Sequence, residues 1–94
     1  MADQKLVSLL EQLVAIPSVS PEYAEDPSAS GEARIAGFLA DTLARIGFKI
    51  EFDEVAPGRP NLIASFGPDK PGRTLLFESH MDTVGVTGMS RPPF

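Results

Sequence analysis

Residues 73–84 read RTLLFESHMDTV, and the apolar run at 74–77 is the strongest indication of the fold class. The run does not alternate with polar residues, which is typical of a strand buried on both faces. Such a strand needs a layer of structure on each side. We therefore predict an α/β fold in which helices pack on a sheet that contains this run.

Two further strands are expected before this run. Residues 48–53, FKIEFD, alternate apolar and charged side chains, the pattern of a strand with one solvent-facing side. Residues 61–66 form a second short apolar run, and the turn-rich link 67–72 is short enough to join it to 73–79 in a hairpin. The sequence thus predicts a mixed β-sheet of about three strands.

Two amphipathic helices are expected before the strands. Between Asp3 and Ile16 the leucines recur with the spacing of one helix face, and Asp3 is placed to cap the helix or to favour its positive end. A second stripe of the same period runs from Ser30, the expected N-cap, to Gly47, where a left-handed terminator is expected. Because two helices cover only one face of a sheet, residues 1–94 are expected to form one incomplete domain, with no second domain.

The composition excludes several classes of protein. The chain is 43% hydrophobic and 22% charged, which is ordinary for a folded soluble protein. Eight basic and thirteen acidic residues give a net charge of −5, and without a basic cluster nucleic acid is not an expected partner. The absence of cysteine excludes disulfides and thiolate zinc sites. No stretch suits a signal peptide or a membrane span, so we expect a cytoplasmic protein that binds no membrane.

The single histidine is the main candidate for chemistry. His80 follows the buried run, at the kind of position where open α/β sheets place their sites. On extended backbone, residues two apart project to the same side, so Asp82 can lie beside His80 while Met81 turns away. Asp82 could then accept the second ring N–H of a metal-bound imidazole. On spacing alone, a single histidine near a strand end is more often a hydrogen-bonded structural residue than a ligand.

Neighbouring residues carry weaker signals. Ser79 is not expected to be a nucleophile, because it points away from His80 on a strand and no nucleophile-elbow turn surrounds it. Glu78 is expected to be a solvated or capping carboxylate. The proline-rich loop at 17–27 is a candidate for the wall of a substrate entrance.

Residues 75–84, LLFESHMDTV, resemble the first metal motif of the M20 metallopeptidase family, which includes acetylornithine deacetylase, succinyl-diaminopimelate desuccinylase and aminoacylase. Four more segments resemble landmarks of that family in the same order: LVAIPSVS at 13–20, LARIGF at 43–48, RPNLIA at 59–64 and GMSRPPF at 88–94. The resemblance therefore covers nearly the whole chain.

The resemblance implies the N-terminal part of a catalytic domain that holds two zinc ions, with cobalt as another metal that could serve. His80 matches a metal ligand, and Asp82 matches the catalytic aspartate that orients it. The implied reaction is hydrolysis of the amide bond of an N-acyl amino acid or dipeptide, and the acetylornithine deacetylase branch is the nearest match.

The family's other metal ligands and its general base fall beyond Phe94, so the resemblance implies an enzyme segment that is inactive as an isolated chain. The alternative is a stand-alone, non-catalytic binding or regulatory module derived from such an enzyme. A further alternative is an expressed fragment whose uncovered strand edges and apolar face would drive self-association.

Overall fold

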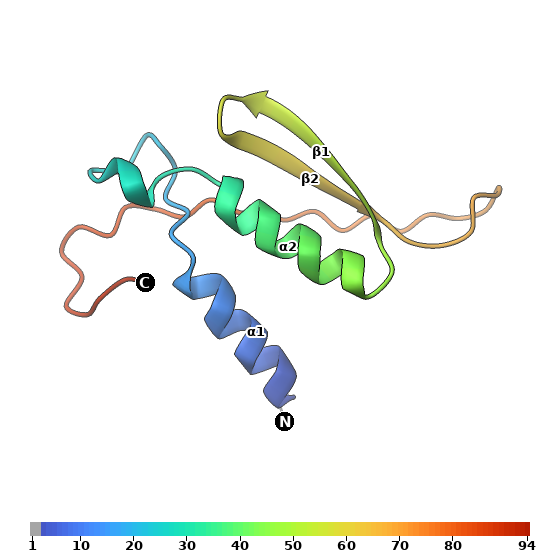
Figure 1. Ribbon diagram of the computed structural model, residues 1–94, viewed down its shortest axis with the longest axis horizontal. Coiled ribbons are helices and arrows are strands. Elements are labelled where there is room, and N and C mark those ends of the chain that lie inside the picture. Colours follow the sequence, from blue (N-terminus) through green and yellow to red (C-terminus); the bar gives the residue numbers. More distant parts are fainter. Residues whose placement is uncertain (1–2) are drawn as a thin grey trace.

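A computed structural model of the chain describes residues 3–94 and confirms the α/β class, with two helices and a two-stranded antiparallel sheet (Figure 1). No helix in the described range is long and apolar enough to cross a membrane. The elements in chain order are α1 (Gln4–Ala15), the short 3-10 helix η1 (Pro27–Ala29), α2 (Ala33–Arg45), β1 (Lys49–Ala56) and β2 (Arg59–Ser65).

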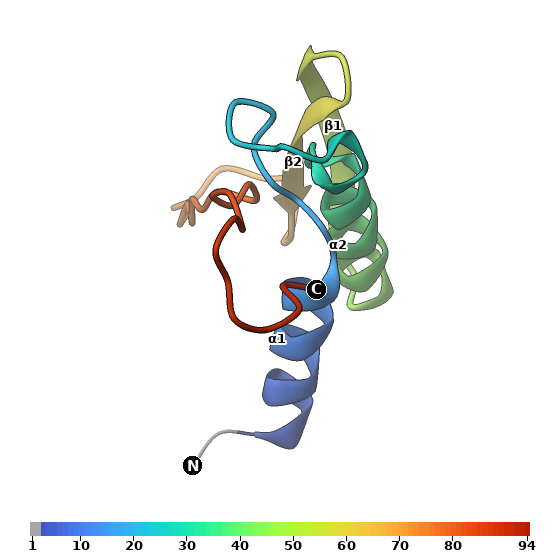
Figure 2. The ribbon, with the colours of Figure 1, turned by 90° about the vertical axis from the view of Figure 1, so that its left-hand side faces the viewer.

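Helix α1 forms where the leucine spacing predicted it. The side chain of Asp3 accepts a hydrogen bond from the backbone N–H of Lys5 at 3.0 Å, so Asp3 is the N-cap. Leu6 and Val14 are about 60% exposed, Leu9 and Leu13 are half-buried, and no residue of α1 is buried. Figures 1 and 2 show α1 set apart from the layer formed by α2 and the strands.

Helix α2 carries most of the small core. Its buried residues Ile35, Ala36 and Ala40 are spaced so that they share one face of the helix. The helix begins at Ala33 after Glu32, so the prediction of Ser30 as N-cap is wrong. Ser30 is instead used in backbone pairing with a neighbouring segment.

The predicted terminator at Gly47 is confirmed. Gly47 has a φ of 105° and donates its N–H to the Ala44 carbonyl at 3.1 Å, while Phe48 donates to the Leu43 carbonyl at 3.0 Å. This pair of bonds is a Schellman motif, which needs a left-handed residue at the position of Gly47. The chain then reverses into β1, and the rings of Phe48 and Phe66 lie 5.2 Å apart.

Strands β1 and β2 pair in an antiparallel hairpin. Ile50 lies opposite Ala64 and Phe52 opposite Leu62, so these apolar residues share one face of the sheet. Helix α2 packs against the hairpin, where Ile50, Leu62 and Ala64 are half-buried. The alternation expected at 48–53 holds over its first half, but Phe52 is 55% exposed and departs from it.

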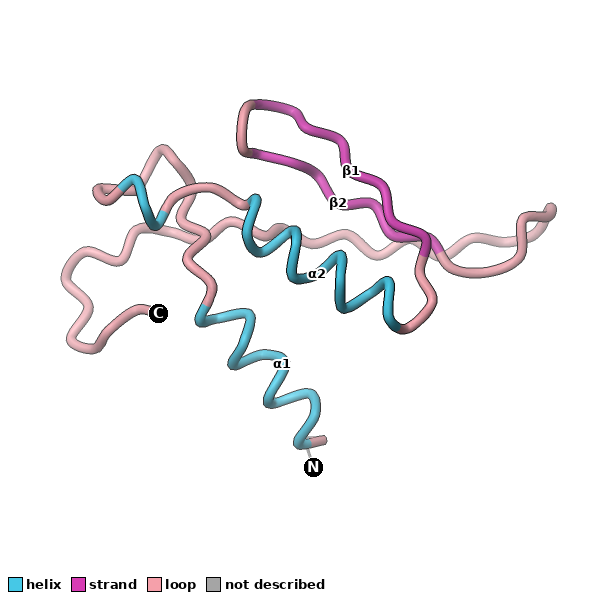
Figure 3. The backbone as a smooth tube through the Cα atoms, viewed as in Figure 1, coloured by secondary structure: helices cyan, strands magenta, loops and turns pink. Residues whose placement is uncertain are grey.

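The expected third strand is not present among the described residues. The hairpin turn is at Pro57 and Gly58, not at 67–72, because β1 and β2 pair with each other across this tight turn. Residues 66–94 form neither helix nor strand (Figure 3). The run at 74–77 was expected to be buried, but Phe77 is 86% exposed. An apolar run is buried only where layers of structure cover it, and the described part of the chain places none over this one.

The longest continuous buried stretch among the described residues is Ser18, Val19 and Ser20, which the sequence placed in a loop. Val19 is 1% exposed and forms isolated parallel bridges with Ser30 on one side and Thr83 on the other. The segment around Thr83 thus joins two paired segments from the first third of the chain. This parallel pairing fixes the position of the residues around Asp82.

Candidate functional site

His80 and Asp82 lie together as their spacing predicted. The Nδ1 atom of His80 is 3.1 Å from Oδ1 of Asp82 and 2.9 Å from the backbone carbonyl oxygen of Asp82. Both oxygens only accept hydrogen bonds, so we assign the proton of a neutral ring to Nδ1. The lone pair is then on Nε2, and the His80 side chain is 85% exposed. This orientation suits a metal ligand, although the roles of His80 and Asp82 stay predictions.

Two residues that the sequence reasoning missed extend this pair. Arg59 donates from Nε to Oε1 and Oε2 of Glu32 at 3.1 and 3.0 Å, and from Nη2 to Oε1 at 2.7 Å. The same Nη2 lies 3.9 Å from Oδ2 of Asp82. The hydrogen bonds to Glu32 raise the pKa of Arg59, and the negative charges of Glu32, Asp82 and Glu22 add to this against partial desolvation. Glu32, Arg59, Asp82 and His80 therefore form one continuous polar chain.

The backbone next to Asp82 is held by the loop that precedes α2. Thr83 donates its N–H to the Ser18 carbonyl at 3.0 Å and accepts from the Ser20 N–H at 2.9 Å. Gly85 passes so close to Tyr23 that an added Cβ atom would lie 3.0 Å from the Tyr23 carbonyl oxygen. The loop that precedes α2 is thus the support on which the His80 segment rests.

The same loop also places Glu32 at the site. Gly31 donates its N–H to the Val19 carbonyl at 2.9 Å, and Gly31 has a φ of 91°, which turns the chain into α2. Glu32 follows at once and is only 5% exposed. Its carboxylate is compensated by the Arg59 guanidinium, as a buried charge requires.

The donor set for a metal is incomplete. Within residues 3–94 no group of three or more histidine, cysteine, aspartate or glutamate side chains is arranged to hold a metal ion. Glu32 is occupied by Arg59, and one oxygen of Asp82 faces His80. Zinc sites in proteins use about three or four protein ligands. The described residues therefore fit one ligand and its supporting carboxylate, not a whole zinc centre.

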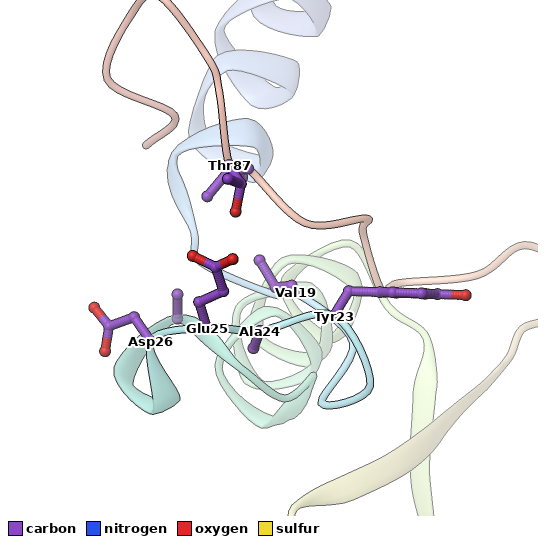
Figure 4. Close-up of a pocket in the computed structure, with 8 residues that line it drawn as sticks. Val19, Tyr23, Ala24, Glu25, Asp26 and Thr87 are labelled. Atoms are coloured by element: carbon purple, nitrogen blue, oxygen red, sulfur yellow. The ribbon is translucent and has the colours of Figure 1, made fainter.

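A pocket of about 170 Å³ lies beside the supporting loop and does not include His80. The Glu25 carboxylate points toward Thr87 in this pocket, while the ring of Tyr23 extends away (Figure 4). The loop at 17–27 was expected to line a substrate entrance, and that role stays a prediction. The lining residues are Val19, Tyr23, Ala24, Glu25, Asp26, Ala29, Val86 and Thr87.

The remaining sequence candidates lie outside the polar chain. Ser79 and Glu78 are both exposed on the unpaired segment before His80. One signal in the sequence could have identified Arg59. It is a basic residue within APGRP at 56–60, where the neighbouring proline and glycine are enough to form the turn without it. The corresponding signal for Glu32 is an acidic residue directly before an amphipathic helix. The favourable interaction of a carboxylate with the helix dipole explains such a residue equally well.

Comparison with known proteins identifies similar enzymes. The chain is 36% identical over 78 residues to acetylornithine deacetylase of Vibrio cholerae, a match that covers 83% of this chain and 20% of the relative. It is 38% identical over 81 residues to acetylornithine deacetylase of Vibrio campbellii, covering 85% and 21%. It is 38% identical over 90 residues to succinyl-diaminopimelate desuccinylase of Methylorubrum extorquens, covering 89% and 20%.

The chain thus spans about a fifth of the length of these curated relatives. No family model and no solved structure matches it. The expected resemblance is confirmed at this level: the chain is similar to a part of acetylornithine deacetylases and of a succinyl-diaminopimelate desuccinylase.

Proposed function

We propose that this chain is part of a metal-dependent amidohydrolase of the M20 type that cleaves N-acyl amino acids, in the manner of an acetylornithine deacetylase. His80 is the zinc ligand that the chain contributes, and Asp82 is the carboxylate that holds the ring of His80. Cobalt or another divalent metal could take the place of zinc. The observation that carries the proposal is the orientation of His80, with Nδ1 on Asp82 and Nε2 free.

The similarity to named enzymes supports the substrate class. The relatives are called deacetylase and desuccinylase, and both names describe removal of an acyl group. The similarity covers at least 83% of the chain in each of these two relatives.

The charge around His80 supports a cationic ligand. The polar chain contains two carboxylates, Glu32 and Asp82, and one guanidinium, Arg59. It therefore carries one excess negative charge next to an exposed imidazole nitrogen. A complete metal centre needs further ligands from outside the described residues. The part played by this chain is to keep a proton on Nδ1 of His80, so that the lone pair of Nε2 is directed at the metal.

A segment exchange tests this function. The part of Vibrio cholerae acetylornithine deacetylase that matches this chain is replaced by the corresponding residues of this chain, and deacetylation of N-acetylornithine and bound zinc are measured. His80→Ala should abolish turnover and lower the zinc content. Asp82→Asn should lower metal affinity or activity by about 10 to 100-fold, the usual cost of losing such a carboxylate. Ser79→Ala is the matched control and should leave both readouts unchanged.

The outcomes separate the metal from the substrate. Full zinc content in the His80→Ala chimera would refute His80 as a ligand. A folded, zinc-loaded chimera that does not deacetylate N-acetylornithine would refute the substrate. The isolated chain is expected to bind zinc weakly in calorimetry and to show no turnover, because a single imidazole holds zinc poorly. Tight binding by the isolated chain that is lost in His80→Ala would point to ligands shared between copies.

A further inference from the structure

We propose that Arg59, itself fixed by Glu32, is a positioning residue that holds the Asp82 carboxylate so that its Oδ1 faces Nδ1 of His80. The inference deepens the proposed function, because it concerns the residue through which Asp82 orients the candidate ligand. Arg59 touches neither His80 nor a reacting atom, and it acts through Asp82 alone.

The first step is that Arg59 is immobilised. Its planar guanidinium makes three N–H···O contacts with one carboxylate, at 2.7 to 3.1 Å, from two nitrogen atoms. The acceptor, Glu32, is itself 5% exposed at the start of a helix. A fork-shaped contact of this type restricts direction as well as distance. A long, flexible side chain is thereby held in one place.

The second step is that the two oxygens of Asp82 are divided between two partners. Oδ1 lies 3.1 Å from Nδ1 of His80, and Oδ2 lies 3.9 Å from Nη2 of Arg59. A separation of 3.9 Å is longer than a hydrogen bond, so Arg59 acts on Oδ2 through its charge. The attraction of Oδ2 toward Arg59 selects the rotation of the carboxylate in which Oδ1 faces His80.

The third step is that the backbone brings these residues together from three places in the chain. Glu32 follows the segment paired with Val19, and Asp82 precedes Thr83, which pairs with Val19 from the other side. Arg59 begins β2 and reaches Glu32 and Asp82 with the same nitrogen. One arginine thus connects the start of α2, the hairpin and the His80 segment.

The tautomer of His80 provides the readout. Nδ1–H of His80 has two acceptors, the backbone carbonyl oxygen of Asp82 at 2.9 Å and Oδ1 at 3.1 Å. When the carboxylate turns away, only the carbonyl oxygen remains, so the preference of the neutral ring for a proton on Nδ1 becomes weaker. The chain contains one histidine, so the ring-nitrogen NMR signals of the metal-free chain need no assignment among several rings. The ratio of the two tautomers is measured at one fixed pH where the ring is neutral.

The decisive variant is Arg59→Gln. It should shift the tautomer ratio at least twofold toward Nε2–H in a chain whose circular dichroism matches that of the unchanged chain. Glu32→Gln should shift the ratio in the same direction, because Arg59 loses its anchor. Asp82→Ala removes Oδ1 but keeps the backbone carbonyl at residue 82, so it gives the largest shift that loss of the carboxylate can produce. Arg73→Gln removes the same charge from an exposed arginine and should leave the ratio unchanged.

Arg59→Lys keeps the charge but not the planar fork, so a smaller shift in the same direction is expected. It is also the variant to measure if Arg59→Gln does not fold. An unchanged ratio in the folded Arg59 variant overturns the positioning role, and an unchanged ratio in Glu32→Gln overturns the anchoring role of Glu32. The measurement uses no metal and no substrate. Its failure is therefore distinct from failure of the segment exchange, which tests the proposed function.

Discussion

Glycine to alanine can be tested at one position inside α2 and at one just after it, with opposite expected effects on the free energy of unfolding. Gly47 has a φ of 105°, and a Cβ atom added there would lie 3.3 Å from the ring of Phe66. A side chain in left-handed backbone costs about 1–2 kcal/mol, and strain of this kind reaches about 3 kcal/mol. Gly47→Ala should therefore lower the free energy of unfolding by about 1–3 kcal/mol.

Gly37 lies inside α2 and serves as the matched position. A Cβ atom added at Gly37 meets no atom within 4 Å. Alanine in a helix interior is favoured over glycine by roughly 0.5–1 kcal/mol, so Gly37→Ala should stabilise the chain by up to that amount. Gly47→Asn should fall between Gly47→Ala and the unchanged chain, since asparagine tolerates left-handed backbone.

Urea unfolding followed by far-UV circular dichroism measures all three variants. The slope of each transition should be unchanged, so that the midpoints report stability alone. For a domain of this size, each kcal/mol corresponds to roughly 4–8 °C in Tm. A Gly47→Ala variant as stable as the unchanged chain would refute the Schellman motif at Gly47. A destabilised Gly37→Ala variant would refute the free space around the added Cβ atom.

Three smaller changes test other contacts. The backbone N–H and the hydroxyl of Ser28 donate hydrogen bonds that lower the pKa of Asp26. Asp26 therefore contributes stability above the ordinary aspartate pKa, and this stability is lost as pH falls through the lowered value. Ser28→Ala should move the Asp26 pKa partway back up, as measured by NMR titration. Asp3→Ala removes the α1 cap and should cost roughly 0.5–2 kcal/mol of helix stability, seen as lost ellipticity. Val19→Ala opens space at a residue that is 1% exposed and should cost about 2 kcal/mol in urea unfolding.

Each of these changes has a contrary result. An Asp26 pKa that does not move in Ser28→Ala would mean that the hydroxyl bond is not formed in solution. Full ellipticity in Asp3→Ala would mean that α1 begins without its cap. A neutral Val19→Ala would place Val19 outside the core. An Asp41→Ala variant, at an exposed position in α2, is a control for the loss of one carboxylate.

The local features of the fold could be predicted from the sequence. The leucine spacing of α1 and the terminator at Gly47 depend on neighbouring residues, and the structure confirms both. The alternation of 48–53 is also local, and it holds as far as Glu51. The run at 74–77 is exposed, contrary to the prediction, because burial depends on what covers a residue and not on hydrophobicity alone.

The site could be predicted only in part. His80 and Asp82 are two residues apart, so local geometry was enough to place them together. The pairing of Arg59 with Glu32 spans 27 positions and depends on how the hairpin packs against the start of α2. Ser30 was predicted as a cap because its residue type suits one, but its backbone is used in pairing with Val19.

The bridges made by Val19 have a consequence for the order of folding. Helices and a tight hairpin form from local contacts, but Thr83 must close a loop over most of the chain before it meets Val19. Closing such a loop costs chain entropy that is recovered only when the contact is complete, so contacts of this kind form late. A chain with native helix content and an intact hairpin could therefore still lack the polar chain around Asp82. Correct secondary structure and a formed site are separate states of this molecule, and a spectrum that reports the first does not establish the second.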